Sequence, residues 1–578
     1  MGACSSKNEE PHRDGDTAPS RGLRRGRSKG NFNTDLRDKN ETTKTFSEVL
    51  VRKNQLPVWE VYDLSQGVEL GRGACGMVQV VKKISSGELF AMKTVSLDNM
   101  GGETMEELRQ EIEVQRSLDH PNIVKLHEWF EEKRRNQLHI VMELCSGGAL
   151  VSRMKRHRHG YGEAAARKLV EKMLSATLYC HQRGVVHRDI KLDNFIYEHE
   201  GDDAELKMID FGFAHESYGG GDGGMREQIG TPSYMAPELW ADHEVEYDSS
   251  VDLWAMGVVT YMLLSGKRPF HHQDRAVKAR MIRETPVPFS GAEWDHVSPE
   301  GIDFISALLQ KDPKQRISAS EALKHPWFTC APKEVDAGEA EERNAAVLAS
   351  LESFARADDI KKVALEVIAF ATPPNVLAEL RKTFQNIDTD KSGTLSPGAR
   401  YREISGDTGD VRSWSPRLGT ISPAEFKEAM GFTLRSARES GGEGDDIASK
   451  HIDALFRHAD INASGELDYT EFLGAGLCQT RHVTKPSMMS AFAILDCNGD
   501  GFISKLELRA TLGEDYEEAE LEEMIASCGG ENSCITFEQF KAMMLKDMKV
   551  FSSTNRKWAS SGNLSALSTS QKAKSAKA

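Results

Sequence analysis

The stretch His187-Arg188-Asp189-Ile190-Lys191-Leu192-Asp193-Asn194 decides how the rest of the chain is interpreted. It places a carboxylate at Asp189, a cation at Lys191 and an amide at Asn194. A carboxylate that accepts a proton from an attacking hydroxyl, close to an amide ligand for Mg²⁺, suits phosphoryl transfer. Lys191 lies between them and would neutralise the phosphoryl group in transit. The alternative is an ordinary polar turn, which the same residue types also fit.

A glycine-rich stretch favours the first interpretation. Residues 71–78 (GRGACGMV) have the spacing G-x-G-x-x-G-x-V between two runs of β character. Such glycines let backbone amides approach nucleotide phosphates, because no Cβ intervenes. Lys93 would hold the α- and β-phosphates, and a charged helix between residues 103 and 118 offers Glu111 as its partner. Alone, the glycines would also fit a dinucleotide-binding turn, and Glu111 would also fit a solvated helix face.

Two further segments complete a nucleotide site. Asp210-Phe211-Gly212 supplies a second Mg²⁺ ligand at Asp210. Residues 138–144 (LHIVMEL) predict a strand that runs into a hinge, with Met142 at the back of an adenine pocket or simply in the core. The residues that we expect to contact ATP are Gly71, Gly73, Gly76, Val78, Ala91, Lys93, Met142, Glu143 and Ile196.

In this order, the motifs resemble those of a complete eukaryotic-type protein kinase over residues 58–328. The resemblance implies a bilobal α+β fold that ends near residues 325–328 (HPWF). It also implies an ion pair between Glu238, in the Ala-Pro-Glu motif, and Arg316. Thr231 resembles the residue that selects Ser/Thr over Tyr acceptors. In the similar calmodulin-dependent kinases a Glu usually follows the Gly-Gly below the hinge and reads a substrate arginine, whereas this chain has Ala149 there.

Composition narrows the class of protein. With 578 residues the chain should hold several domains, because single cores rarely exceed about 300 residues. The net charge of −16 argues against nucleic-acid binding. Nine scattered cysteines suit a reducing compartment and predict neither disulfides nor a zinc site. No apolar run reaches the ~18 residues of a membrane span.

The first residues carry a membrane-attachment pattern. Met1-Gly2-Ala3-Cys4-Ser5-Ser6 fits N-myristoylation at Gly2, and Cys4 offers a site for palmitoylation. Because one acyl chain binds membranes only marginally, the basic run at residues 21–29 would act as a second signal. The alternative is a basic tail with a chance Gly2. Residues 1–57 are otherwise polar, and we predict a disordered leader.

Two calcium-binding loops stand out near the C-terminal end. Residues 496–507 (DCNGDGFISKLE) fit the EF-hand loop completely, with a glycine at the sharp turn. Residues 460–471 repeat the pattern with one carboxylate fewer. The predicted calcium ligands of the two loops are Asp460, Asn462, Ser464, Glu466, Glu471, Asp496, Asn498, Asp500, Phe502 and Glu507.

Two other hands depart from the pattern. A fourth loop would begin at Cys528 and end at Gln539, so it lacks both end carboxylates; we predict a folded, empty hand that pairs with the third loop. The first begins at Asp388, but its sequence is complete only if residues 395–420 are skipped and the loop resumes at Ile421. An insert would therefore split it and weaken calcium binding, unless the insert comes from an alternative transcript. The possible weak ligands are Asp388, Asp390, Ser392, Thr394 and Glu425.

Between the two parts, residues 347–370 show apolar residues at helical spacing, with Lys361 and Lys362 on a polar side. Such a helix would lie in a kinase groove or in the groove of a calcium-sensor lobe, or would simply be a packing helix. Kinase, junction and four hands together resemble the calcium-dependent protein kinases of plants and protists. The predicted organisation is a leader (1–57), a kinase domain (58–328), an autoinhibitory junction (329–378), an all-α calmodulin-like domain (379–545) and a disordered tail (546–578).

The resemblance implies a serine/threonine kinase that uses ATP and Mg²⁺, is blocked by its junction at rest and is released by Ca²⁺. We expect protein substrates, a monomer and a location at the cytoplasmic face of a membrane, with the plasma membrane favoured, and in the cytoplasm. The sequence leaves two alternatives open. One is a calcium-responsive membrane scaffold whose kinase fold does not catalyse. The other is an enzyme fixed in one state because the split first hand uncouples the switch.

Overall fold

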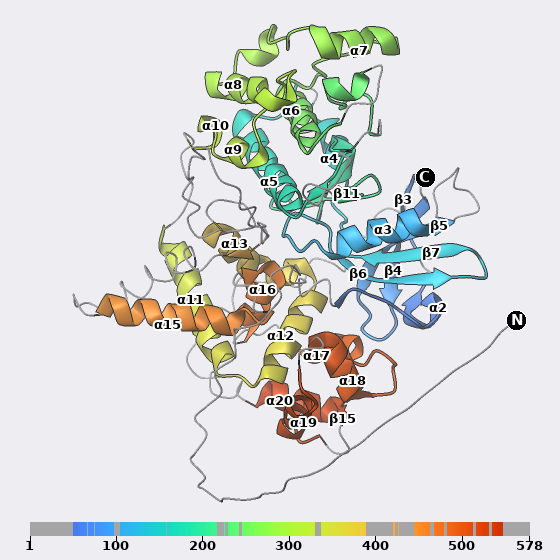
Figure 1. Ribbon diagram of the computed structural model, residues 1–578, viewed down its shortest axis with the longest axis vertical. Coiled ribbons are helices and arrows are strands. Elements are labelled where there is room, and N and C mark those ends of the chain that lie inside the picture. The colour runs from blue at the N-terminus through green and yellow to red at the C-terminus, as the bar shows by residue number, and fades with distance from the viewer. Residues whose placement is uncertain are drawn as a thin grey trace, which may run out of the picture. The chain divides into compact units, whose positions relative to one another are not determined.

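The computed structural model (Figure 1) describes residues 50–546, apart from 66, 74–75, 97–104, 158, 217–224, 226–228, 242–245, 330–336, 389–419, 422–425, 427–443, 463–466, 479–482, 513–515 and 531–533. All of them belong to one compact unit, Thr43–Ala578.

A twisted sheet forms the first lobe of the kinase region. Its strands follow the order β1-β6-β7-β5-β4-β2, and β3 also pairs with β4. Apolar side chains on one face of β5 and β7 pack with Leu108 and Ile112 of a helix, α3. The elements are β1 (Arg52–Lys53), α2 (Val58–Val61), β2 (Tyr62–Asp63), β3 (Glu69–Gly73), β4 (Gly76–Lys83), β5 (Leu89–Ser96), α3 (Met105–Arg116), β6 (Leu126–Glu132) and β7 (Gln137–Met142).

The second lobe is mainly helical. Its centre is α6, which is apolar on every side and almost completely buried, as expected of a helix that other helices surround. Gly266 ends α6 in the left-handed conformation (φ 71°). Figure 1 shows α6 beside α8 and α5. The elements are α4 (Leu150–Met154), α5 (Glu163–Gln182), β8 (Val185–Val186), β9 (Phe195–Tyr197), β10 (Leu206–Met208), β11 (His215–Glu216), α6 (Ser250–Ser265), α7 (Arg275–Glu284), α8 (Pro299–Leu308), α9 (Ala319–Leu323) and α10 (Pro326–Thr329).

The C-terminal part is helical, with two short sheets, each made of two strands. Each sheet joins a pair of loops that lie between helices, which is the arrangement predicted for EF-hands. The elements are α11 (Ala337–Ala355), α12 (Asp359–Ala371), α13 (Ala378–Ile387), β12 (Thr420–Ile421), α15 (Gly444–Ala459), β13 (Leu467–Asp468), α16 (Tyr469–Leu477), α17 (Lys485–Leu495), β14 (Phe502–Ser504), α18 (Lys505–Leu512), α19 (Glu518–Ser527), β15 (Cys534–Thr536) and α20 (Phe537–Leu545).

The junction differs from its prediction in two respects. Residues 347–370 do not form one helix, because the chain breaks between α11 and α12, where Asp358 has extended backbone at the start of α12. Lys361 does not lie on a polar face, since its exposed fraction is only 5%. Eleven of the thirteen residues of α12 are buried, including Lys361 and Glu366, so the side of the helix that was predicted to be polar is largely covered.

None of the described residues forms a single helix that is long and apolar enough to cross a membrane.

Candidate functional site

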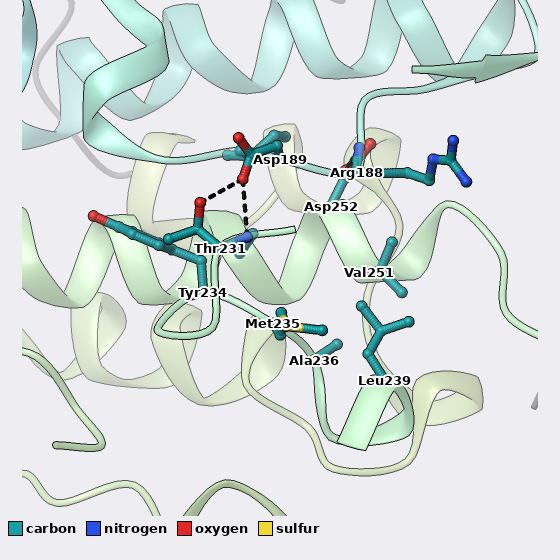
Figure 2. Close-up of a pocket in the computed structure, with 11 residues that line it drawn as sticks. Arg188, Asp189, Thr231, Tyr234, Met235, Ala236, Leu239, Val251 and Asp252 are labelled. Carbon is teal, nitrogen blue, oxygen red and sulfur yellow. Dashed lines mark hydrogen bonds between the residues drawn. The ribbon is translucent and has the colours of Figure 1, made fainter. Parts of the chain in front are cut away.

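Three residues donate hydrogen bonds to the carboxylate of Asp189, and Figure 2 shows the two bonds from Thr231. Its Oδ1 accepts from the Thr231 amide at 3.0 Å and from the Thr231 hydroxyl at 2.7 Å. Its Oδ2 accepts from Lys191 Nζ and from Asn194 Nδ2. The structure therefore brings the predicted residues Asp189, Lys191, Asn194 and Thr231 together around one carboxylate.

A second aspartate, which the sequence did not single out, fixes the backbone of this loop. Asp252, in the first turn of α6, accepts hydrogen bonds from the amides of His187 and Arg188, both at 2.9 Å. Arg188 has a φ of +64°, which L-residues rarely adopt, so these bonds maintain an unfavourable conformation. Burial raises the pKa of the Asp252 carboxyl, but the hydrogen bond and charge of His181 outweigh it and leave the pKa below its ordinary value.

The predicted pair of Lys93 and Glu111 is confirmed. Lys93 Nζ lies 2.8 Å from Glu111 Oε1 and 3.8 Å from Asp210 Oδ1. The pair joins β5 to α3, and Asp210 comes from the loop after β10. A lysine held this way, near a carboxylate in the left-handed conformation (φ 68°), suits a site for nucleotide phosphates and a metal ion.

The glycine-rich stretch forms a hairpin of β3 and β4. Gly71 pairs with Val78, and Gly73 pairs with Gly76. Gly76 has a φ of +136°, and a Cβ there would lie 2.2 Å from the Thr94 carbonyl oxygen, so only glycine fits. The turn itself, at residues 74–75, lies outside the described residues.

The expected adenine contacts come from both lobes. Val78 lies opposite Lys93, and Ala91 lies opposite Met142 in neighbouring strands. Ile196 is in β9 of the helical lobe and is half-buried. The Glu143 side chain has a different role, because it is buried and its Oε1 accepts from Lys207 Nζ at 2.8 Å and from the Lys125 amide at 2.7 Å. A contact of Glu143 with ATP would therefore come from its backbone.

The ion pair implied for Glu238 and Arg316 is confirmed. Arg316 donates from both terminal nitrogens to the two carboxylate oxygens, at 2.8 and 3.1 Å. The same guanidinium donates to the carbonyl oxygens of Ser250 and Gln310. Because the arginine side chain is fully buried, this network fixes the segment after the activation region against α6.

The third calcium loop has the local geometry that its ligands need. Asp496 accepts hydrogen bonds from the amides of Asp500 and Gly501, which curl the loop around this carboxylate. Gly501 has a φ of +87°, as the sharp turn requires. Glu507 accepts from the amides of Asn498 and Ser504, so it faces the start of the loop. The donor set of three carboxylates, one amide oxygen and the Phe502 carbonyl fits Ca²⁺.

The second loop repeats this geometry where it is described. Glu471 accepts from the amides of Asn462 and Asp468, at 3.2 and 2.9 Å. Burial and the charge of neighbouring carboxylates raise the pKa of Glu471, and burial raises that of Asp468 to about 7. A crowded, desolvated set of carboxylates is the electrostatic condition that a divalent cation relieves.

The fourth hand pairs with the third, as the sequence predicted, and the first pairs with the second. Ile503 of the third loop lies opposite Ile535 of the fourth, in the sheet of β14 and β15. In the fourth hand Gln539 Nε2 donates to the Gly529 carbonyl at 2.5 Å, so an internal hydrogen bond closes the loop. Ile421 lies opposite Leu467 of the second loop, as expected if the first loop resumes at Ile421 after the insert.

Several predicted site residues lie outside the described residues. They are Gly2, Cys4, Asp390, Ser392, Thr394, Glu425, Ser464 and Glu466.

Comparisons with known proteins agree with this geometry. The protein kinase domain family matches residues 64–328, and the EF hand family matches residues 380–398 and 488–512. The chain is 31% identical to calcium-dependent protein kinase 21 of Arabidopsis thaliana, over 83% of this chain and 82% of that protein. It is also 31% identical to calcium-dependent protein kinase 33 of the same plant and 30% identical to calcium-dependent protein kinase 2 of Zea mays, over 84% and 90% of those proteins.

The chain belongs to the calcium-dependent protein kinases. It is accordingly a protein serine/threonine kinase with a bilobal kinase domain and an EF-hand region. A kinase domain implies ATP and Mg²⁺, and EF-hands imply Ca²⁺.

In this calcium-dependent protein kinase the second hand contacts the kinase domain directly. The Thr470 amide, at the start of α16, donates to Asp119 Oδ2 at 2.9 Å, and Lys125 Nζ donates to the Thr470 hydroxyl at 3.2 Å. Arg381 of α13 forms a buried ion pair with Glu198, also at 2.9 Å. The sequence held no signal for these pairs, because each joins residues that are far apart along the chain and ordinary in their local context.

Proposed function

We propose that this kinase transfers the γ-phosphate of ATP with Asp189 as the group that accepts the proton of the substrate hydroxyl. The supporting observation is the hydrogen-bond network that aims Asp189 and Lys191 at one point beside Thr231. Asn194 and Asp210 would hold Mg²⁺, which neutralises phosphate charge when bound. Lys93, fixed by Glu111, would hold the α- and β-phosphates.

We infer that the junction controls this activity in response to Ca²⁺. The observation that carries the inference is the burial of α12, whose most extensive contacts are with α16 and α17 of the second and third hands. Near the end of α12, the ring centroid of Phe370 also lies 5.3 Å from that of His127 in the kinase domain. Exposing the apolar surface of α12 to water would cost roughly 25 cal/mol for each Å². When the helix leaves one apolar groove, it must therefore bind in another.

The switch then follows from the hands. Ca²⁺ binding opens pairs of EF-hand helices and exposes apolar grooves, which stabilises the arrangement with α12 held by the hands. Without Ca²⁺ those grooves close, and the junction would bind the kinase groove and block the substrate. None of the residues that line the pocket at Asp189 in this arrangement comes from the junction. The protein would therefore alternate between two states that Ca²⁺ biases.

The experiment that tests both proposals is phosphate transfer from Mg-ATP to a basic Ser/Thr peptide, first with excess Ca²⁺ and then with a chelator. Activity with Ca²⁺ alone supports the catalytic assignment and the switch. Equal activity in both conditions contradicts the switch. If folded protein that binds ATP transfers no phosphate to any of several peptides, the alternative of a non-catalytic scaffold replaces the catalytic assignment.

We also propose that the N-terminus attaches the kinase to the cytoplasmic face of a membrane through acylation of Gly2 and Cys4. The sequence pattern and the basic run at residues 21–29 support this proposal. Incorporation of labelled fatty acid in cells tests it, with Gly2→Ala and Cys4→Ser as variants. Equal labelling of the wild type and the Gly2→Ala variant would contradict myristoylation.

A further inference from the structure

A groove of about 690 Å³ lies in the helical lobe, on a surface that the catalytic mechanism does not use. Its walls come from the chain at 146–157, the exposed side of α5 and the turn between β9 and β10. None of its lining residues belongs to the catalytic loop at 187–194. The volume falls in the range of about 300–1,000 Å³ that is typical of ligand sites.

The groove is basic, although the protein as a whole carries a net charge of −16. Four cations line it, namely Arg153, Arg156, Lys168 and Lys172, against the two carboxylates of Glu200 and Asp202. Arg156 belongs to a basic run in the sequence, residues 155–159 (KRHRH). A concave surface with an excess of one sign of charge focuses the electrostatic field and attracts the opposite charge.

Arg153 is fixed in place by groups that do not neutralise it. Its guanidinium donates to the carbonyl oxygen of His199 at 2.9 Å and to that of Gly147 at 3.4 Å. Its Cζ also lies 3.6 Å from the centre of the Tyr197 ring. A guanidinium that is already ordered loses little conformational entropy when it binds an anion. By contrast, Lys172 is paired with Glu205 at 2.8 Å.

Glycine also shapes the groove. A Cβ at Gly147 would lie 2.1 Å from the His199 carbonyl oxygen, so this wall can approach the β9–β10 turn only with glycine. Gly148 follows with a φ of +76°. The two glycines connect the groove to the hinge at Met142 and Glu143. The backbone at these two glycines therefore forms a fixed wall of the groove, in addition to the charged side chains that line it.

We propose that this groove docks an acidic segment, rich in Asp and Glu, of the protein substrate. The inference rests on the protein kinase activity and deepens it by naming a class of substrate. The groove lies on the lobe that also carries Asp189, and Tyr197 in its wall follows Asn194 of the catalytic loop by only three residues. Charge complementarity with the cations of the groove favours an acidic segment. An extended chain spans about 3.3 Å per residue, so a segment of a few residues can contact several of these cations.

The test uses two peptides with the same Ser/Thr acceptor and linker. One ends in an acidic segment of Asp and Glu, and the other ends in the matching Asn and Gln segment. The groove variant is Arg156→Glu with Lys168→Glu, and both side chains are exposed. The control is Lys133→Glu with Arg134→Glu, which makes the same charge change on the exposed turn between β6 and β7.

In the wild type and the control we expect the acidic segment to lower KM about tenfold, with kcat unchanged, and this gain to shrink at high salt. The groove variant should lose the gain but phosphorylate the neutral peptide normally. The proposal is overturned if the acidic segment does not lower KM in the wild type, or if the groove variant keeps the gain.

Direct binding separates this proposal from the catalytic assignment. Fluorescence anisotropy of a labelled acidic peptide without an acceptor needs no phosphate transfer. Binding that the groove variant loses and the control keeps supports the groove even if no peptide is phosphorylated. If the groove variant instead loses binding to phosphatidylserine vesicles while its peptide KM values match those of the wild type, the groove serves a membrane surface and the proposal fails.

Discussion

Ile421 pairs with Leu467 across the short sheet that joins the first two calcium hands. Leu467 holds position 8 of the second loop, which is counted from Asp460. Its partner Ile421 is therefore position 8 of the first loop. Position 7 is Thr394, so residues 395–420 lie between two consecutive positions of the loop. Phe426 is the first described residue after this strand. It is completely buried, and its ring packs against that of Phe456. The first hand thus keeps its pairing strand and its exiting core residue on the far side of an insert.

Deleting residues 395–420 should increase the calcium affinity of the first hand. Closing a loop of this length costs roughly (3/2)RT ln n, about 3 kcal/mol, which corresponds to on the order of 100-fold in affinity. Calorimetric calcium titrations of the full chain and the deletion variant check this. Identical isotherms would contradict it and would remove the insert as a cause of weak binding.

Replacing Gln539 with Glu should not create a fourth calcium site. The Gln539 amide donates to the Gly529 carbonyl, and a carboxylate there would face that carbonyl without a proton to donate. Position 1 is Cys528, so the loop would still lack its first oxygen ligand. Because this hydrogen bond is exposed to solvent, we expect a loss of only about 0.5–1.5 kcal/mol in the stability of the hand, and no additional calcium bound. A gain in calcium stoichiometry would contradict this interpretation.

Replacing Glu111 with Gln should impair catalysis and leave calcium binding unchanged. Gln keeps the size of the side chain but loses the charge that holds Lys93 at 2.8 Å. Misplacing a group that positions the nucleotide costs on the order of 100-fold in kcat/KM. Steady-state kinetics with Ca²⁺ and ATP measure the loss. Glu113→Gln, an exposed change on the same helix, is the matched control and should retain wild-type activity.

The sequence predicted which side chains of the catalytic loop meet and how the third calcium loop closes, because both depend on local spacing. A catalytic loop or an EF-hand loop carries most of its ligands within one short segment, so the pattern survives without knowledge of the fold. The partner of Lys93 was also accessible, because one helix follows the strand. The sequence could not predict Asp252 or Asp119, whose partners lie far along the chain, and it misplaced Lys361 because its helix is covered on all sides.

The buried Glu366 of α12 gives the last prediction, which concerns pH. The side chain is completely buried, and neither carboxylate oxygen has a hydrogen-bond partner in the structure. Burial, together with the charges of Asp468 and Asp460, raises the pKa of Glu366 well above its ordinary value. In the folded protein this carboxyl therefore holds its proton at a pH at which the unfolded chain has already lost it.

The sign of the effect on stability follows from this difference. Below the unfolded pKa of about 4.3 both states are protonated, and Glu366 then makes no unfavourable contribution. As the pH rises from there toward the raised pKa of the folded state, the unfolded state loses its proton first and the free energy of unfolding falls. Glu366→Gln should therefore raise stability at pH 8 more than at pH 5. Midpoints of urea unfolding in calcium-free buffer measure this, with exposed Glu60→Gln as the control. An equal shift at both pH values would show that Glu366 does not titrate in this way.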